Sequence, residues 1–555
     1  MAIGRSSGTG LAGEIETPVL IVGGGPVGLA LAGDLGWRGR DCLLVERTDG
    51  AIVQPRQDLV GIRTMEFCRR WGLVGAVEAA PYDRDYPQDN VYVAGPLAGG
   101  WEIGRYPSPS MNEARPPPES PCRRERCPQN MFDPILRRFA GSHETVSLRY
   151  RHRFLGLQAE GDGAVAEIER TDTGERLRIR ARFVVGCDGA GSTVREALGV
   201  RLAGDPALTH TTNLIFRRDG FEALHDKPPG YRFILLDEEV GTWATIVAIN
   251  GRDEWRMSIV RSSTDGRVLP EVEVRRAIRR AVGRDFDYEL LSVMPWRRRE
   301  LVAETFQSGP AGPLFLAGDA AHAMSPTGGF GMNTGVADAV DLAWKMDAVL
   351  AGWGGPDLLA SYTAERRPVA RRNVREASGN LARMLSPGPQ PGLLEPGPGG
   401  DALRARVGRD LATAMLREWR TLGIHLGYFY EDSPICAADG TPSPSLDPAV
   451  YEPAARPGSR APHADLGDGR SMLDLFGRGF VLLALGPSPP DPEPVVRAAR
   501  MRGMPVETVA LDRPDIARLY AKPLVLVRPD GHVAWRGDAP PPDPLKLVDR
   551  VRGAG

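Results

Sequence analysis

The stretch "PVLIVGGGPVGLALAGDLGWRG" at residues 18–39 decides the fold class of this chain. An apolar run leads into three closely spaced glycines, and an alanine- and leucine-rich amphipathic segment follows them. This order is typical of a buried strand, a tight glycine turn and a helix. "DCLLVER" at residues 41–47 is a second apolar run. Residues 17 to about 50 therefore predict the first strand–helix–strand unit of a Rossmann-type α/β domain.

The glycines have the spacing G-x-G-x-x-G that binds dinucleotides. The first makes the tight turn, the second lets the backbone approach a pyrophosphate, and the third lets the helix pack on the strand. An acidic residue at the end of the second strand accepts from a ribose hydroxyl and repels a 2′-phosphate. The motif therefore predicts FAD or NAD rather than NADP, but it does not distinguish FAD from NAD. The candidate contacts are Gly23, Gly25, Pro26, Gly28, Glu46 and Arg47.

A second motif, "FVVGCDGAGSTVREALG", occupies residues 183–199. It reads as a buried strand that ends at Asp188-Gly189, followed by a turn of small residues and a short helix that contains Arg195. Taken alone, the aspartate also fits the ordinary N-cap of a helix in an α/β turn. Its place after the first motif makes it a candidate cofactor contact.

A third motif, "LFLAGDAAHAMSPTGGFGMNTGVADAVDLAWKM", spans residues 314–346. Gly318-Asp319 ends a buried strand, and the aspartate can accept from a ribityl hydroxyl. A glycine-rich run then brings bare backbone close to a flat ligand. The helix from about Asn333 directs its positive end toward the ligand, which suits an anionic reduced flavin. Further candidate contacts in this motif are Pro326, Gly331 and Met332.

In this order the three motifs resemble those of the FAD-dependent aromatic hydroxylases, the single-component flavoprotein monooxygenases of the p-hydroxybenzoate hydroxylase fold. The resemblance covers about residues 17–400. It implies that the first motif binds the ADP half of FAD, and that Asp188 and Gly189 contact both FAD and a passing NAD(P)H. It places Asp319 on the ribityl and diphosphate. In "RERCPQNMFDPIL" (124–136) it makes Arg126 and Gln129 FAD contacts, ahead of a short helix with Pro134 in its first turn.

The resemblance also implies a reaction. NAD(P)H reduces FAD, O2 adds at flavin C4a, and the distal oxygen of the resulting C4a-hydroperoxyflavin is transferred to an electron-rich ring. The protein has to hold the ring near C4a, exclude water and help to deprotonate a phenol. Pro326, Gly328 and Gly329 are expected to wall the pocket where oxygen reacts. Whether NADPH or NADH is the reductant stays open.

A base is suggested by "QDLVGIRTME" at residues 57–66. Phenol hydroxylases carry a similar segment, A-D-G-L-x-x-R-T-L-E, and Asp58 and Arg63 fall on its aspartate and arginine. This chain departs from the pattern because Leu59 replaces a glycine, and because the strand "WRMSIV" lacks the tyrosine found at the matching place. Asp58 is therefore a candidate phenol base, and a turn-capping aspartate beside FAD is the alternative.

The substrate pocket is expected mainly between residues 205 and 300, where strands rich in aromatic residues form one wall. Each aromatic residue alone fits a core position equally well. Arg256 is a weaker candidate for a phenolate contact. We expect His322 to pack behind the flavin loop rather than to react. The candidate substrate residues are Phe233, Trp243, Trp255, Arg252 and Trp296, with Phe216 and Tyr231 as further lining candidates.

These observations predict an α/β protein with three parts. A Rossmann-type FAD-binding domain of the glutathione-reductase and p-hydroxybenzoate hydroxylase type covers 17–90, 126–204 and 301–400. An interleaved β-sheet substrate domain covers 91–125 and 205–300. Residues 401–555 resemble the thioredoxin-like domain of phenol and polyketide hydroxylases. Because this last part holds only Cys436 and no C-x-x-C, we expect it to be redox-inactive, and it is a candidate homodimer surface.

The composition limits the classes of partner that the chain can bind. The 555 residues carry a net charge of −2, so the chain has no field to recruit nucleic acid or an anionic membrane. No uncharged apolar stretch is long enough to span a bilayer, and the six scattered cysteines have no metal-ligand spacing. We expect a cytoplasmic enzyme that binds a small aromatic molecule.

Three alternatives stay open at this point. The same fold performs Baeyer–Villiger insertion and epoxidation of polyketides. Flavin-dependent halogenases share the FAD fold, but the W-x-W-x-I-P segment is absent around Trp101 and Trp353. A non-catalytic flavin- or ligand-binding protein is the alternative from another class, and the intact glycine motifs argue against it.

Overall fold

The first sheet brings the three glycine motifs to one edge. In this computed structural model, which describes residues 12–52, 54–263, 266–309, 312–467 and 469–555, the strands run in the order β7-β2-β1-β10-β9-β8, with β16 paired to β10. The strands β7, β2, β1, β10 and β16 pair in parallel, whereas β9 and β8 add antiparallel neighbours. Val22 and Leu316 are both in register with Gly186. The strands are β1 (Ala12–Val22), β2 (Cys42–Glu46), β7 (Val146–Tyr150), β8 (His152–Glu160), β9 (Gly163–Arg170), β10 (Arg176–Gly186) and β16 (Leu314–Leu316).

Helices cover this sheet. The apolar faces of α1 and α7 pack on each other, and α1 also packs on α4. These helices follow the predicted segments, and α7 begins three residues before the expected Asn333. The helices of this layer are α1 (Pro26–Trp37), α2 (Ile62–Arg70), α3 (Val74–Glu78), α4 (Gln129–Gly141), α5 (Thr193–Ala197) and α7 (Phe330–Leu350).

One detail of the sequence prediction was wrong. Pro134 lies inside α4 rather than in its first turn, because the helix begins already at Gln129, directly after Pro128. A proline at this position leaves the carbonyl of Asn130 without its usual helical partner. The buried side chains of Phe132, Leu136 and their neighbours hold the helix despite that loss.

The second sheet has eight strands in the order β17-β15-β11-β14-β13-β12-β4-β5. Two strands from the early part of the chain complete it, and β4 pairs with β12 in parallel. The strands are β4 (Asn90–Ala94), β5 (Trp101–Tyr106), β11 (Leu202–Arg217), β12 (Arg232–Asp237), β13 (Gly241–Ala248), β14 (Glu254–Val260), β15 (Glu289–Ala303) and β17 (His322–Ala323). A small ladder of β3 (Leu59–Val60) and β6 (Glu125–Arg126) lies outside it.

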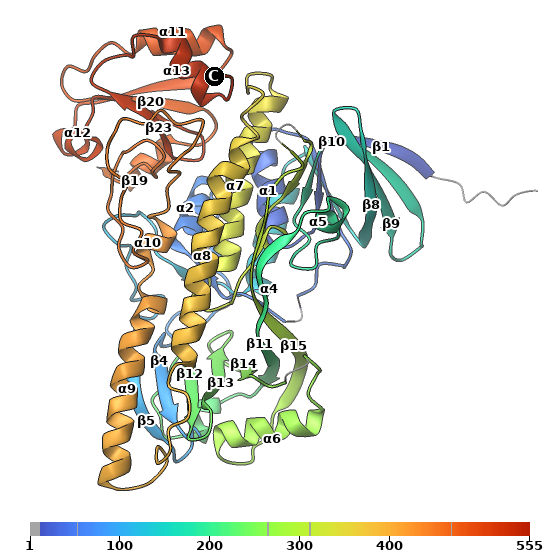
Figure 1. Cartoon of the computed structure of the whole chain (residues 1–555), viewed down its shortest axis with the longest axis vertical. Helices are drawn as coiled ribbons and strands as arrows, with labels where there is room; N and C mark the ends of the chain where they lie inside the picture. Colours follow the sequence, from blue (N-terminus) through green and yellow to red (C-terminus); the bar gives the residue numbers. More distant parts are fainter. Residues whose placement is uncertain (1–11, 53, 264–265, 310–311, 468) are drawn as a thin grey trace, which may run out of the picture.

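Both faces of the second sheet are covered. On one face α6 (Glu271–Val282) closes a core with aromatic side chains, and on the other α8 (Ser361–Leu385) and α9 (Pro398–Trp419) pack against β12, β4 and β5. Figure 1 shows α8 and α9 as two long neighbouring helices on this sheet. The start of the expected C-terminal part thus packs on the second sheet, because the apolar face of α9 meets Tyr92 and Ile234 there.

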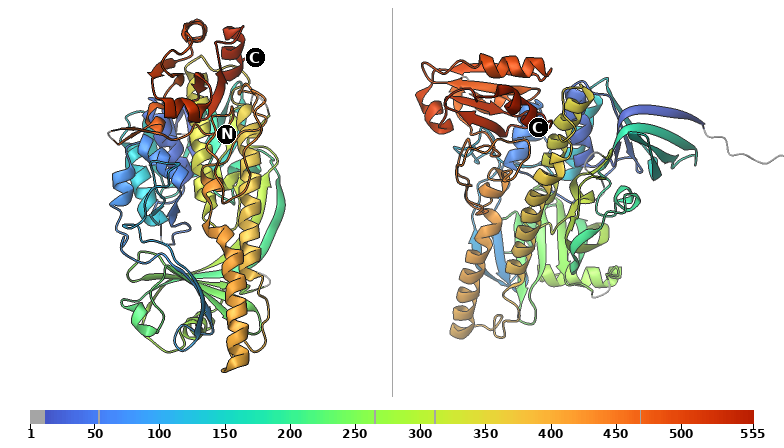
Figure 2. Two further views of the ribbon diagram at one scale, coloured as in Figure 1. Left: turned by 90° about the vertical axis from the view of Figure 1, so that its left-hand side faces the viewer. Right: turned by 45° about the horizontal axis from the view of Figure 1, so that its top comes forward.

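The C-terminal part is a four-stranded sheet in the order β21-β20-β22-β23 with helices around it. Its hairpin turns at Asp530-Gly531 as predicted, where Gly531 N–H donates to Arg528. Figure 2 shows this domain at the opposite end of the molecule from the second sheet. The predicted fold class is confirmed. The elements are α10 (Leu422–His425), β18 (Asp465–Gly467), β19 (Arg470–Ser471), β20 (Phe480–Leu485), α11 (Glu493–Met501), β21 (Val506–Leu511), α12 (Pro514–Tyr520), β22 (Leu524–Val527), β23 (Val533–Gly537) and α13 (Pro544–Val551).

Buried ion pairs attach this domain to the FAD-side layer. Glu66 on α2 accepts from Arg460 at 3.0 Å, from Arg63 at 2.8 Å and from Ser120 at 2.6 Å. Burial opposes the charge of Glu66, but Arg460 and Arg63 outweigh it and lower the pKa of that carboxyl to about 2. The interface therefore depends on an ionised Glu66. Among the described helices, none is both long and apolar enough to cross a membrane.

We expect Glu66→Gln to lower the free energy of unfolding by about 3 kcal/mol at neutral pH. The folded-state pKa lies below the ordinary value of 4.5, so this contribution is fully present above pH 4.5 and is lost as the pH falls through about 2. Urea unfolding followed from pH 7 down to the acid limit checks this. Glu493→Gln, at an exposed site on α11, is the control and should change little. Equal stability losses in the two variants would contradict the assignment.

Candidate active site

The first glycine loop has the shape of a dinucleotide cradle. Gly23 has φ of +112°, which only glycine adopts readily, and its N–H donates to Val45 on β2. A Cβ on Gly28 would lie 2.0 Å from the carbonyl oxygen of Gly23, so the helix and the strand touch through backbone alone. A Cβ on Gly25 would meet nothing within 4 Å, which leaves space over that backbone for a ligand. The loop therefore fits the pyrophosphate of FAD.

Glu46 orders this loop. One of its carboxylate oxygens accepts from the N–H of Gly24 at 2.8 Å, and the other accepts from the N–H and hydroxyl of Thr48, also at 2.8 Å. Pro26 is the first residue of α1, where a missing N–H costs nothing. Arg47 is exposed beside Glu46. The predicted first-motif residues thus lie together at the end of β1.

The second motif forms a capped turn. The carboxylate of Asp188 accepts from Thr193 Oγ1 at 3.0 Å and from the N–H of Val194 at 3.2 Å. It thereby supports the start of α5, whose N-cap is Ser192. Gly189 follows it with φ of +82°. Arg195 donates to Ala320 in the third motif at 3.0 Å. The second and third motifs are therefore fastened to each other.

The third motif rests on a buried charge cluster. Asp338 on α7 accepts from Gly318 N–H at 3.2 Å, from Arg366 Nε at 2.8 Å, and pairs with His322 Nε2 at 2.7 Å. His322 is fully buried behind the loop, where the sequence placed it. Asp319 is exposed to solvent, and one of its carboxylate oxygens lies close to Gly331 at the start of α7. Desolvation by the surrounding protein raises the pKa of this carboxyl. A ribityl hydroxyl fits such an acceptor.

The glycine loop before α7 is held by hydrogen bonds within the loop and to α8. Gly328 and Gly329 have φ of +93° and +68°, and the N–H of Gly329 donates to Pro326. The hydroxyl of Thr327 donates to Ala377 on α8 at 2.6 Å. Gly331 and Met332 follow in the first turn of α7. Bare backbone and the positive end of a helix thus meet at this point.

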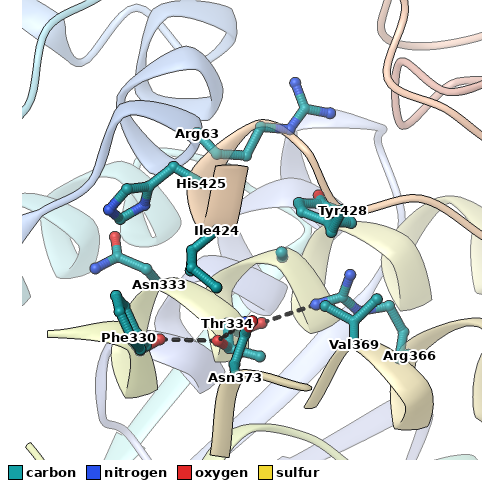
Figure 3. Close-up of a pocket in the computed structure, with 11 residues that line it drawn as sticks. Arg63, Phe330, Asn333, Thr334, Arg366, Val369, Asn373, Ile424, His425 and Tyr428 are labelled. Atoms are coloured by element: carbon teal, nitrogen blue, oxygen red, sulfur yellow. Dashed lines mark hydrogen bonds between the residues drawn. The ribbon is translucent and has the colours of Figure 1, made fainter. Parts of the chain in front are cut away.

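Asn333 joins this loop to the Asp58 segment. Its amide nitrogen donates to the carbonyls of Gly329 and Leu59, and its oxygen accepts from the N–H of Gly61 at 2.8 Å. Next to Asn333 is a small cavity of about 20 Å³, which the sequence analysis did not predict. Residues from α2, α7, α8 and α10 line it (Figure 3). His425 reaches Asn333 from α10, and burial, together with Arg124, lowers the pKa of that imidazole to about 4.

Asp58 is enclosed by cations and a phenol. Its carboxylate accepts from Arg126 at 3.0 Å, from Arg256 at 3.2 Å and from the hydroxyl of Tyr231 at 2.5 Å. The guanidinium of Arg126 stacks 3.5 Å from the centre of the Tyr231 ring. Burial opposes the charge, but Arg126 and Arg256 lower the pKa of Asp58 below its ordinary value. The group is therefore an ionised, hydrogen-bonded carboxylate.

The missing tyrosine has a substitute. The strand "WRMSIV" supplies no tyrosine to Asp58, but Tyr231 does so from the start of β12. Burial raises the pKa of Tyr231, so its hydroxyl stays protonated and donates to the carboxylate. Sequence reasoning named this tyrosine only as a lining candidate.

The other predicted residues are spread more widely. Gln129 accepts from the N–H of Arg56, and its amide donates to Asp133. Trp296 is partly buried with the guanidinium of Arg56 over its ring, 5.8 Å from the ring centre. Arg252 is exposed on the β13–β14 turn and donates to Pro81.

Three predicted wall residues do not join Asp58. Phe233, Trp243 and Trp255 are buried in the core that α6 closes, whereas Arg232 and Arg256, their neighbours in the strands, point to the opposite face. Successive residues of a strand alternate between faces, so the structure brings the arginines rather than the aromatic rings to the Asp58 side.

Sequence reasoning missed Glu418 and Arg298. Glu418 on α9 accepts from both Arg232 and the N–H of Gly328. Arg298 on β15 is buried and donates to Thr211. In the sequence, the only sign of these two residues is that each is a charged residue in a segment that is otherwise apolar on one face.

These loops, strands and helices define a flavoprotein monooxygenase fold, and comparisons with known proteins agree. The model of an "FAD binding domain" matches residues 16–377, and that of "Aromatic-ring hydroxylase, C-terminal" matches residues 454–553. A putative polyketide hydroxylase of Streptomyces halstedii is 34% identical, over 95% of this chain and 94% of that protein.

Two solved structures extend the likeness over the whole chain. RebC, soaked with chromopyrrolic acid and containing 7-carboxy-K252c, is 41% identical, covers 98% of this chain and 100% of its own, and has a TM-score of 0.90. Aklavinone-11 hydroxylase in complex with FAD and aklavinone is 28% identical, covers 97% and 99%, and has a TM-score of 0.79. The chain belongs to the FAD-dependent aromatic-ring hydroxylases. It is an FAD enzyme that uses O2.

Proposed function

We propose that the protein hydroxylates a phenolic or polyketide-type aromatic small molecule with electrons from NAD(P)H, in natural-product tailoring. The names of relatives support the substrate class, since they include polyketide hydroxylases and aklavinone 12-hydroxylases. The observation that carries the proposal is the junction at Asn333. This side chain fastens the glycine loop to the segment of Asp58, so a charged cluster and the flavin loop share one support.

The chain's own groups have distinct tasks in this proposal. Bound FAD supplies the oxygen-transfer chemistry. Gly23, Gly25 and Gly28 hold the pyrophosphate, and Asp319 accepts from the ribityl chain. The Pro326–Gly331 loop would border the flavin ring and keep water from it.

Substrate recognition is assigned to the second sheet. Residues 91–125 and 205–300 form the substrate domain in this proposal. The carboxylate of Asp58 holds Arg126, Arg256 and Tyr231 in place beside the ring to be oxidised.

The test measures the consumption of NADPH and of NADH by the purified holoenzyme in the presence of a panel of phenols and polycyclic quinone-phenols. The mass of every product is determined by mass spectrometry. The proposal expects one compound to accelerate oxidation and to gain one oxygen atom from 18O2. NMR of that product then separates ring hydroxylation from oxygen insertion. Oxidation that yields only hydrogen peroxide with every compound would contradict the proposal.

Asp58→Asn is expected to lower kcat/KM about tenfold while FAD content stays unchanged, because charge-assisted hydrogen bonds to Arg126 and Arg256 are weakened. The pKa of Asp58 lies below 3.8, so this carboxylate is ionised throughout the neutral range. Any loss of activity between pH 6 and 8, read from a kcat profile, should therefore persist in Asp58→Asn. Disappearance of that limb in the variant would make Asp58 the titrating base.

A further inference from the structure

Arginines outnumber carboxylates where the side of the second sheet turned away from α6 meets the β3–β6 ladder. Two carboxylates of the described chain contact this group, Asp58 and Glu418. Asp58 is shared by two arginines and Glu418 holds a third, so positive charge is in excess. The arginines are Arg124, Arg126, Arg232, Arg256 and Arg298.

Arg298 shows that this excess is not compensated inside the protein. Its residue is 5% exposed, and its Nε donates to Thr211 at 3.2 Å, but its Nη1 is buried without an acceptor among the described residues. Burial and the nearby Arg232 lower the pKa of this guanidinium to about 10. A buried cation without a partner is costly, and an anionic ligand that completes the pairing removes the cost.

Glu418 connects the arginines to the flavin loop. One carboxylate oxygen accepts from Arg232 Nη1 at 2.9 Å and from the N–H of Gly328 at 3.2 Å. The other oxygen is buried and has no partner in the described part of the chain. Only one oxygen of Glu418 accepts hydrogen bonds, and it is shared between Arg232 and the N–H of Gly328. The Arg232–Glu418 pair therefore leaves hydrogen-bonding capacity unused, and a second anion can compete for Arg232.

We infer that Arg298 and Arg232 bind a carboxylate carried by the aromatic substrate, and that Glu418 is the counter-ion which this carboxylate displaces. The inference rests on the proposed function and adds the charge of the substrate to it. Glu418 is a positioning residue in this arrangement, because it acts on the glycine loop through the N–H of Gly328. Substrate binding, by displacing Glu418, therefore also affects the glycine loop that borders the flavin.

Binding can be measured on the holoenzyme without turnover. Flavin absorbance and calorimetry are followed during titration with 2-naphthoate, and with 2-naphthamide, its neutral analogue of nearly the same shape. We expect the wild type to bind the acid about tenfold or more tightly than the amide. Arg298→Gln should lose most of that preference. Glu418→Gln removes the competing charge but keeps an oxygen for Gly328, so it should bind the acid several-fold more tightly and the amide unchanged.

Arg284→Gln is the matched control, since it removes an exposed arginine beside α6 and should alter neither titration. Equal binding of acid and amide by the wild type, absence of a response to either, or weaker acid binding in Glu418→Gln would overturn the inference. Bound FAD and oxygen incorporation into a substrate are measured separately, so these outcomes do not depend on the proposed hydroxylation.

Discussion

Gly28→Ala should prevent the chain from yielding a stable holoenzyme. The added Cβ would lie 2.0 Å from the carbonyl oxygen of Gly23 and 3.3 Å from the Cβ of Cys187. The first contact is with backbone that is itself fixed by β1 and β2, so α1 has to move away from the sheet. A clash of this kind at a close helix–strand contact is expected to cost more than about 4 kcal/mol. Soluble yield, the ratio of FAD to protein and thermal unfolding check the result.

Gly25→Ala is the matched variant, at the N-cap of α1 in the same glycine loop. Its Cβ meets nothing within 4 Å and its φ is −77°, so the apoprotein should unfold at the wild-type temperature. The methyl group would occupy the space where the backbone approaches the pyrophosphate, and we expect FAD affinity to fall about tenfold or more. Wild-type FAD binding by Gly25→Ala would show that the pyrophosphate lies elsewhere.

The three glycine motifs could be predicted because each is local. A strand, a turn and a helix within about twenty residues can be recognised from the hydrophobic periodicity and the glycine spacing of the sequence. The strand register then brings the loops together. Gly186 pairs with both Val22 and Leu316 in adjacent parallel strands, so the loops that follow these residues meet at one edge of the sheet. Glycine positions with backbone at contact distance, such as Gly28, tolerate no other residue.

The surroundings of Asp58 could not be read in that way. Its partners are 68, 173 and 198 residues distant along the chain, at Arg126, Tyr231 and Arg256. Tertiary packing alone makes these neighbours, and no local pattern records it. The same holds for Glu418, which stands in the helical segment "LREWR" and looks there like one charge of a solvated face.

The side of the second sheet that each aromatic residue faces could not be predicted for a different reason. In β13 every residue is buried, because helices cover both faces of the second sheet. A strand buried on both faces has no polar alternation to tell one face from the other. The sequence therefore does not tell whether Phe233 or its neighbour Arg232 faces α6, and only the packing of α6 separates them.

A second cluster of buried charge fixes the C-terminal domain to α7 and α8. Arg528, beside the β22–β23 turn, donates to Glu365 on α8 at 2.5 and 3.0 Å, to Asp341 on α7 at 3.1 Å and to Asp530 at 2.7 Å. Lys345 adds a second cation, at 2.8 Å from Asp341 and 2.6 Å from Glu365. These groups are almost completely removed from solvent, so each charge depends on the others.

Arg528→Met should therefore lower the free energy of unfolding by about 3–5 kcal/mol, because it leaves buried carboxylates without their main cation. Arg502→Met is the control, since its pair with Asp549 lies at the surface and should contribute little to the free energy of unfolding. Urea unfolding of both variants gives the comparison. Adding Glu365→Gln to Arg528→Met should restore part of the loss, since the charge left unpaired is then removed. A loss no larger than that of Arg502→Met, or full additivity in the double variant, would show that this cluster does not hold the domains together.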